Sequence, residues 1–477
     1  MARKQNFISQ LKKDWLVLPF AFFSVVLYST INILKHSRFE TFMYDLGLVD
    51  QVLWKVSRFY SPQSTVTNLP SIFWSRHLDL TFYLQAPFYW LWPDVRMYLI
   101  LEPLIVALGV FPVYFFAKEK LGRILGLAVS FSYLFSLGVQ YALDYPGHMD
   151  IRLATFLGFL FYFLFQKKKR LVYFLALLCL FTKESSVFYL IFIGLFAIFV
   201  LKEKRLGLIL ISFSLLFLVL ISGYLSSPFF VFWDWYKHLG WGPWGILGSL
   251  VSPIDKLKTL FWLLFSFGFL PLLNLPLLLV SLPMFLERFL ANRPELWGLA
   301  LHYNILTVPV FVFSTIFGLE YLKSFLKIKK KIFVNLSVCY LVFCTLGTTF
   351  LQKTFVMRIF DPKFYQFPLY LKATKKMMSQ IPTYATLEAQ EDLFPHLSHR
   401  DKIYPLGEGG AVEFIALDVN LFAAQRGGKD RYIKKLLDDP DYGLVFCEEG
   451  AVLFERGKRD KVEVCPKVKE FSARFEI

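Results

Sequence analysis

Long apolar runs separated by short polar segments set the hydropathy pattern of this chain. Several runs reach the roughly 20 residues that a helix needs to cross a bilayer. The pattern predicts about eleven transmembrane helices within residues 1–352, beginning at about Trp15–Leu34. Two of them form a helical hairpin in the run at 257–290, which PLLNLP interrupts. The chain is therefore expected to be an α-helical polytopic membrane protein.

Basic residues cluster between these runs, at 118–123, 167–170, 202–205 and 323–331. Because Lys and Arg are enriched in cytoplasmic loops, the clusters place the N-terminus inside and the C-terminus outside. The first run follows basic residues and lacks an A-x-A-like cleavage site, so it is interpreted as a signal anchor. The expected location is the cytoplasmic or inner membrane.

Two segments of this pattern are expected to lie outside the membrane. Residues 35–96 form a large first outer loop, whose run HLDLTFYLQAPFYWLW is short for a span and is predicted to lie in the membrane interface, with Trp90 and Trp92 at headgroup depth. From residue 353 the composition becomes that of a soluble domain, with short strand-like and helical segments. Residues 353–477 therefore predict a small extracytoplasmic α/β domain.

Composition supports a membrane protein: 56% of residues are hydrophobic, 19% are aromatic, and the mean hydropathy is +0.50. The net charge of +16 comes from the clusters between spans, and no groove-reading motif accompanies it, so no nucleic-acid partner is expected. Cys447 and Cys465 can pair if the C-terminal part is extracytoplasmic. Two free thiols on separate elements remain the alternative.

The clearest chemical signal is the stretch FETFMYDLGLVDQVLW at 39–54, which places Asp45 and Asp50 in an amphipathic segment beside the membrane. A carboxylate buried in lipid costs several kcal/mol, so it must serve a polar site or face water. Asp45, with apolar neighbours on both sides, is the predicted catalytic residue. The alternative makes it the N-cap of a helix LGLVDQVLW, worth about 1 kcal/mol of local stability.

Other polar residues interrupt the apolar runs on the same predicted outer side, where they could line a cleft at the membrane surface. The alternative is that loops are simply polar. The predicted substrate- or phosphate-binding residues are Asp50, Arg76, His77, His148, Asp150, Lys183, Glu184, Arg293 and His302.

The stretch Asp45–Trp54, D-L-G-x-x-D-Q-x-L-W, resembles a motif of an uncharacterised family of polytopic membrane proteins, a domain of unknown function. The resemblance continues through the rest of the chain, although GHMD stands where the family has F-H-P-E, which puts the role of Asp150 in doubt. The further matching elements are His77, Pro87–Tyr89, His148 with Asp150, Lys183–Glu184, His302–Asn304 and Pro395–Arg400.

That family in turn resembles the glycosyltransferase C superfamily, integral membrane enzymes that use polyprenyl-phosphate sugars. The resemblance implies that Asp45 is a general base or a metal-site acid. It also implies that a cation neutralises the departing lipid phosphate, with Arg76, Lys183 and Arg293 as candidates. No specific ligand set is evident; no cofactor is certain, and a divalent metal is left open.

The resulting hypothesis is transfer of a sugar from a polyprenyl-phosphate carrier to an unknown acceptor on the outer face. The alternative is a transporter or flippase of a lipid-linked substrate, which would favour broken helices and charges at the midplane of the membrane. Most charges here fall at predicted helix ends, which favours the enzyme. A non-catalytic scaffold is a third hypothesis.

Overall fold

The computed structural model describes residues 14–66, 77–225, 231–239, 242–425, 429–458 and 462–473. Contacts divide the chain into two compact units, each assembled from separate stretches of sequence. Unit 1 comprises Met1–Ile31, Phe73–Phe82 and Leu99–Phe360, and unit 2 comprises Asn32–Ile72, Tyr83–Tyr98 and Asp361–Ile477. The unit that contains the C-terminal domain thus also contains most of the predicted first outer loop.

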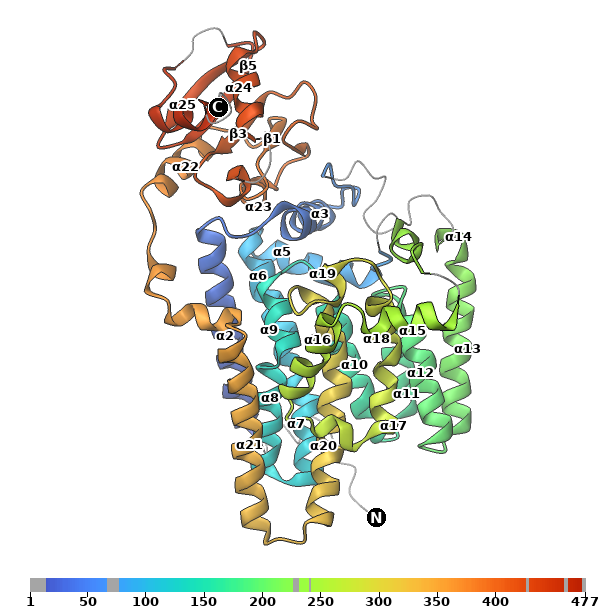
Figure 1. Cartoon of the computed structure of the whole chain (residues 1–477). Coiled ribbons are helices and arrows are strands. Elements are labelled where there is room, and N and C mark those ends of the chain that lie inside the picture. Colours follow the sequence, from blue (N-terminus) through green and yellow to red (C-terminus); the bar gives the residue numbers. More distant parts are fainter. Residues whose placement is uncertain are drawn as a thin grey trace. The chain divides into compact units, whose positions relative to one another are not determined.

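Helices make up the described part of unit 1. Figure 1 shows α7, α8, α10 and α20 running alongside one another. The principal helices are α2 (Val17–Ser37), α6 (Val95–Leu108), α7 (Val110–Leu121), α8 (Arg123–Leu134), α9 (Leu137–Asp144), α10 (Asp150–Phe165), α11 (Lys169–Leu180), α12 (Ser186–Phe199), α13 (Lys204–Leu220), α15 (Pro243–Val251), α16 (Asp255–Phe265), α18 (Leu282–Phe289), α20 (Val308–Phe325) and α21 (Lys330–Leu351).

Among the described residues, four helical stretches are long and apolar enough to cross a membrane, and the bent pair α8–α9 can make a fifth. The four are Val17–Ser37, Val95–Leu121, Pro294–Phe325 and Lys330–Leu351. The apolar helix α12 is shorter. Eleven spans therefore remain a prediction.

The run at 257–290 does not fold as two long helices. Helix α16 is followed by η4 (Leu270–Leu273), α17 (Leu275–Leu278), η5 (Leu279–Ser281) and α18. Pro271, Pro276 and Pro283 each stand near the start of a segment. Since proline lacks an N–H and disfavours helix in the preceding residue, each one starts a new segment rather than continuing the last.

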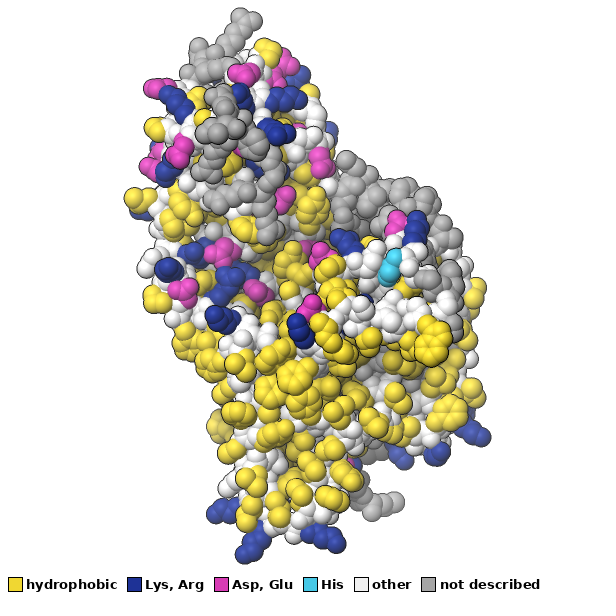
Figure 2. Space-filling model, in the orientation of Figure 1, with side chains coloured by type: hydrophobic (Ala, Val, Ile, Leu, Met, Phe, Trp, Pro, Cys, Tyr) yellow, Lys and Arg dark blue, Asp and Glu magenta, His cyan; other side chains and the backbone are white. Residues whose placement is uncertain are grey.

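Aromatic side chains fill the core between α7, α10 and α20, where the ring of Phe313 lies 5.3 Å from that of Phe116 and 5.7 Å from that of Phe161. Small residues set the approach of α12 to α13: a Cβ on Gly207 would lie 2.4 Å from the carbonyl oxygen of Gly194. Close backbone packing at small residues is typical of membrane helices. Figure 2 shows a broad hydrophobic surface over the helices of this unit.

Unit 2 contains a five-stranded sheet with strand order β2-β1-β3-β5-β4. β1 pairs in parallel with β2 and β3, and β5 pairs antiparallel with β3 and β4. The strands are β1 (Leu387–Ala389), β2 (Ile403–Pro405), β3 (Phe414–Asp418), β4 (Tyr442–Glu448) and β5 (Ala451–Arg456). The five strands all lie within the C-terminal part of the chain, which confirms the prediction of a small domain with a sheet there.

The core of the sheet is formed by alternate side chains of its strands, including Leu417, Val452 and Phe454, and by Ile433 of α24. A disulfide joins Cys447 of β4 to Cys465, with Cα atoms 5.6 Å apart, which answers the question that the sequence left open. The helices of this part are α22 (Tyr370–Met378), α23 (Phe394–Leu397), α24 (Lys429–Asp438) and α25 (Pro466–Ala473).

The N-terminal stretches of unit 2 contribute the π-helical turn η1 (Met43–Gly47), α3 (Leu48–Ser57) and α5 (Ala86–Leu91). The turn η1 packs on α23, and a Cβ on Gly47 would lie 2.7 Å from the ring of Phe394. The glycine therefore permits close contact between two segments that are far apart in the sequence.

Candidate functional site

Three short segments of unit 1 each contribute two charged or titratable side chains to one group, here called the ion-pair ring. One segment precedes the 3₁₀ helix η2 (Leu80–Gln85), the second is the first turn of α10, and the third is the turn between α11 and α12. The members are His77 and Asp79, Asp150 and Arg152, and Lys183 and Glu184.

Each segment of the ring pairs with both of the others, so the pairs form a closed triangle. The pairs are Asp79 with Arg152, Asp150 with Lys183 at 3.2 Å, and Glu184 with His77 at 2.8 Å. All members except His77 are buried. Buried charges are costly unless they are paired, so each segment fixes the position of the other two.

Lys183 contacts a second acid besides Asp150. Its Nζ lies 3.3 Å from the carboxylate of Glu287 on α18, and the hydroxyl of Tyr189 also donates to Glu287. The carbonyl of Glu287 accepts a hydrogen bond of 2.6 Å from Tyr236. Two carboxylates therefore compensate the buried ammonium group.

Two histidines extend the ring on the side of Asp150. His302 Nε2 lies 3.3 Å from the carboxylate of Asp150, and the ring of His148 stacks on His302 with centroids 3.3 Å apart. The carboxylate of Glu102 accepts hydrogen bonds from the backbone N–H groups of Gly147 and His148. Glu102 thus orders the loop that presents His148.

Arg288, the neighbour of Glu287 on α18, is a buried cation of a different kind. Its Nε donates to the carbonyl of Leu296 at 2.8 Å, and Nη2 donates to Oδ1 of Asn304 at 2.5 Å. Among the described residues no carboxylate lies within ion-pair distance of it, and its buried Nη1 has no hydrogen-bond partner. Its positive charge is therefore not neutralised by a direct acid contact.

The structure brings together six of the predicted site residues in unit 1, namely His77, His148, Asp150, Lys183, Glu184 and His302. Arg293 is not among them; half-exposed, it lies 3.8 Å from the carboxylate of Glu295. Arg76 lies outside the described residues. Asp45 and Asp50 belong to unit 2.

Asp45 lies in the π-helical turn η1 and is half-buried. The cap of that turn is Phe42, and the cap of the following α3 is Gly47, so Asp45 does not occupy the N-cap position that the alternative interpretation assigned to it. Single π-helical turns are rare and occur frequently at functional sites. The turn therefore makes this segment unusual in backbone as well as in composition.

Asp50 is fully buried in α3 and accepts hydrogen bonds from the hydroxyls of Tyr89 and Ser398. His399 Nε2 lies 3.0 Å from its carboxylate. Burial alone would lower the pKa of His399, but the Asp50 carboxylate outweighs it and holds that pKa above its ordinary value. Asp50 thus joins the first-loop motif to PHLSHR.

Sequence reasoning missed Glu287 and Arg288 as site residues, because they lie at the end of a run interpreted as a membrane hairpin. An acid–base pair inside an apolar run was the available signal, as it was for Lys183–Glu184. Asp79 and Arg152 were visible as polar residues but carried no motif. The described residues contain no group of three or more His, Cys, Asp or Glu side chains arranged to hold a metal.

The chain belongs to the family described as Predicted membrane protein (DUF2079), whose model matches residues 35–453. The match supports a membrane protein, as do the several apolar helices of the described residues. None of the curated proteins matches the sequence of this chain.

Two solved structures are similar across almost the whole chain. One is the crystal structure of ArnT from Cupriavidus metallidurans bound to undecaprenyl phosphate, with a TM-score of 0.54, 10% identity, and coverage of 95% of this chain and 99% of ArnT. The other is the same protein in the apo state, with a TM-score of 0.50, 11% identity, and coverage of 93% and 98%. At this identity the likeness concerns the fold alone.

Proposed function

We propose that this protein is a membrane glycosyltransferase-like enzyme that moves a sugar from a polyprenyl-phosphate carrier to an acceptor on the outer face of the membrane. The observation that carries the proposal is the fold shared over nearly the full length with a structure that holds undecaprenyl phosphate. A buried set of cations and carboxylates within the helical unit supports it, because such groups are costly in a membrane protein unless they serve a function.

The reaction would form a bond between an acceptor hydroxyl oxygen and the anomeric carbon of the sugar. The bond from that carbon to the carrier phosphate would break, and the phosphate would leave with the electron pair. In this proposal the Asp45 carboxylate takes the proton of the acceptor hydroxyl, as a general base within hydrogen-bond reach of it. The bond formed, the bond broken and the proton transfer are all accounted for in this step without a metal ion.

The departing phosphate needs a positive charge near its oxygens. Lys183 was one of three predicted candidates, with Arg76 and Arg293, and its two carboxylate partners leave it little unbalanced charge. Arg288 is the better candidate, since a guanidinium can bind phosphate oxygens with two parallel hydrogen bonds and its Nη1 is unpartnered among the described residues. We assign the ion-pair ring to holding the surrounding segments in place.

We further propose the topology predicted from the sequence, with about eleven spans, the N-terminus inside and the C-terminal domain outside. Figure 1 supports the placement of the basic loops on one side of the membrane. The loop between α20 and α21, which lies within the basic cluster 323–331, is at the same end of unit 1 as the α7–α8 turn, which lies within the cluster 118–123. The Cys447–Cys465 disulfide supports an oxidising location for the sheet domain.

The test uses purified full-length protein in detergent, with a radiolabelled sugar on undecaprenyl phosphate and a mixture of envelope-derived acceptors. Release of free undecaprenyl phosphate together with label in a new product is the expected result. In proteoliposomes, movement of intact lipid-linked sugar across the bilayer without bond cleavage would instead support the flippase, for which the bent α8–α9 pair is the favouring observation. If neither activity is found and undecaprenyl phosphate does not bind, the non-catalytic scaffold is the remaining hypothesis.

A further inference from the structure

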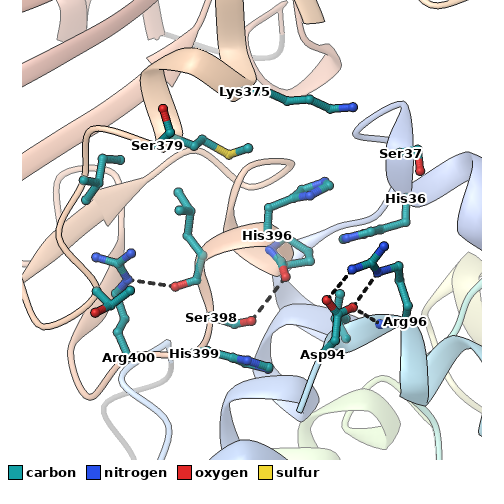
Figure 3. Close-up of a pocket in the computed structure, with 16 residues that line it drawn as sticks. His36, Ser37, Asp94, Arg96, Lys375, Ser379, His396, Ser398, His399 and Arg400 are labelled. Atoms are coloured by element: carbon teal, nitrogen blue, oxygen red, sulfur yellow. Dashed lines mark hydrogen bonds and ion pairs between the residues drawn. The ribbon is translucent and has the colours of Figure 1, made fainter. Parts of the chain in front are cut away.

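A pocket of about 500 Å³ is lined entirely by residues of unit 2, and Asp45 is not among them. Three stretches of sequence form its wall: the end of α2, the start of α6 with the residue before it, and the segment from α22 to PHLSHR. Figure 3 shows side chains of all three stretches directed into the same space. A volume of this size suits a small molecule.

Positive charge dominates the lining of this pocket. Of the described residues that line the pocket, only Asp94 is an acid, and Arg96 already pairs with it at 2.7 Å. Lys375 is exposed on α22, and among the described residues it has no carboxylate partner. Arg400 is buried and donates to the backbone carbonyls of Leu397, Pro382 and Ala385. Within the described part of the chain it has no carboxylate partner, so its charge is not cancelled.

His396 supplies a neutral polar group to the same wall. Its ring stacks on His36 with centroids 3.8 Å apart and packs against Phe39 at 4.1 Å. Its Nε2 atom is buried and has no hydrogen-bond partner among the described residues. Burial is the main cause that lowers the pKa of His396, and the neighbouring His36 and Lys375 lower it further. The pKa lies well below its ordinary value, so the ring is neutral.

From this geometry we propose that the pocket binds a phosphate-bearing polar small molecule of about the size of a sugar phosphate. Uncancelled lysine and arginine charges recognise the phosphate, because charge-assisted hydrogen bonds to phosphate are among the strongest in proteins. The unpartnered His396 nitrogen and the lining hydroxyl of Ser379 suit the hydroxyl groups of the remainder of such a ligand. This inference does not depend on the transfer reaction.

Calorimetric titration of the purified full-length protein tests the site with four probes: glucose 1-phosphate, inorganic phosphate, glucose and dihexanoylphosphatidic acid. We expect binding of glucose 1-phosphate, weaker binding of inorganic phosphate and no binding of glucose. Lys375→Gln should weaken glucose 1-phosphate about tenfold, the lower range for a hydrogen bond to a charged group. Lys376→Gln is the matched control, since Lys376 is the next residue on α22 and pairs with Glu448 instead.

His396→Phe keeps a ring against His36 and removes the unpartnered nitrogen, so it should also weaken binding; the exposed Lys375 variant remains informative if this one does not fold. Equal affinity in wild type and Lys375→Gln, or no binding of glucose 1-phosphate by wild type, would overturn the site. Binding of phosphatidic acid alone would overturn the polar ligand in favour of a lipid headgroup.

Discussion

His399 Nε2 lies 3.0 Å from the Asp50 carboxylate, although the two residues belong to opposite ends of the chain. The same carboxylate accepts from Tyr89 and Ser398, so three hydrogen-bonding groups from two distant stretches converge on it. Gln51, the next residue, donates to the carbonyl of Arg400 at 3.2 Å. The first-loop motif and PHLSHR therefore form one structural element of unit 2.

This ion pair makes stability depend on pH. The pKa of His399 is raised in the fold above the value of about 6.5 for an unfolded histidine, so the pair stabilises fully below pH 6.5. That contribution is lost as the pH rises through the folded pKa. The difference in Tm between wild type and His399→Gln should therefore be largest at pH 5 and shrink toward pH 9. His238→Gln, at an exposed histidine, should show no such trend.

Asp45→Asn should lower the transfer rate by at least about a hundredfold, the lower range of general-base catalysis, while Tm stays close to wild type. The Asp-to-Asn change keeps the shape of the side chain and removes its basicity. Asp438→Asn, at an exposed acid of the same unit, is the control for the substitution itself. Unchanged transfer in Asp45→Asn would remove the assignment of Asp45 as the base.

Asp50→Asn should act mainly on stability, because its amide cannot accept from three donors at once. Breaking a buried pair of this kind costs about 3 kcal/mol or more. Chemical denaturation should show this loss, and the specific activity of the folded fraction should fall much less than in Asp45→Asn. A stable Asp50→Asn protein with no activity would contradict this division of roles.

The ion-pair ring predicts a contrast between two cations of unit 1. Lys183→Gln leaves the buried carboxylate of Asp150 and the partly buried carboxylate of Glu287 without this partner, and it should destabilise by about 3–5 kcal/mol. Arg293→Gln removes a half-exposed pair and should change stability by less than about 1 kcal/mol. Thermal unfolding in detergent measures both, and equal effects would show that the ring contributes no more than a surface pair.

Arg288→Gln should weaken undecaprenyl phosphate binding about tenfold or more, because one charge-assisted contact is lost. Binding can be measured by competition with a fluorescent polyprenyl phosphate. Arg293→Gln again serves as the control, and it should bind as wild type does. If Arg293→Gln alone loses binding, the phosphate contacts the exposed cation that the sequence indicated.

The sequence predicted the elements whose signal is local. Run lengths indicated several apolar helices, of which four, or five with the bent pair α8–α9, are long enough to span a membrane among the described residues. Strand-like segments indicated the strands of the C-terminal sheet. It also singled out Asp150, Lys183 and His302, because polar residues interrupting apolar runs are visible without any knowledge of their neighbours.

The remaining features depend on tertiary contacts or backbone geometry. Nothing local couples Asp50 to His399, since the pairing needs both ends of the chain to reach one unit. Asp45 lies in a π-helical turn, and hydrophobic periodicity does not distinguish such a turn from an ordinary helix. Glu287 and Arg288 lie at the end of an apolar run that was interpreted as a membrane hairpin, so they were not considered as site residues.

Unit 2 is assembled from stretches at both ends of the chain, and this has a consequence for biogenesis. At about 5–20 residues per second, synthesis of the roughly 290 residues between Ile72 and Asp361 takes about 15–60 s. During that time the carboxylate of Asp50 exists without Ser398 and His399. The first loop therefore remains incomplete until the segment that carries Ser398 and His399 has been synthesised.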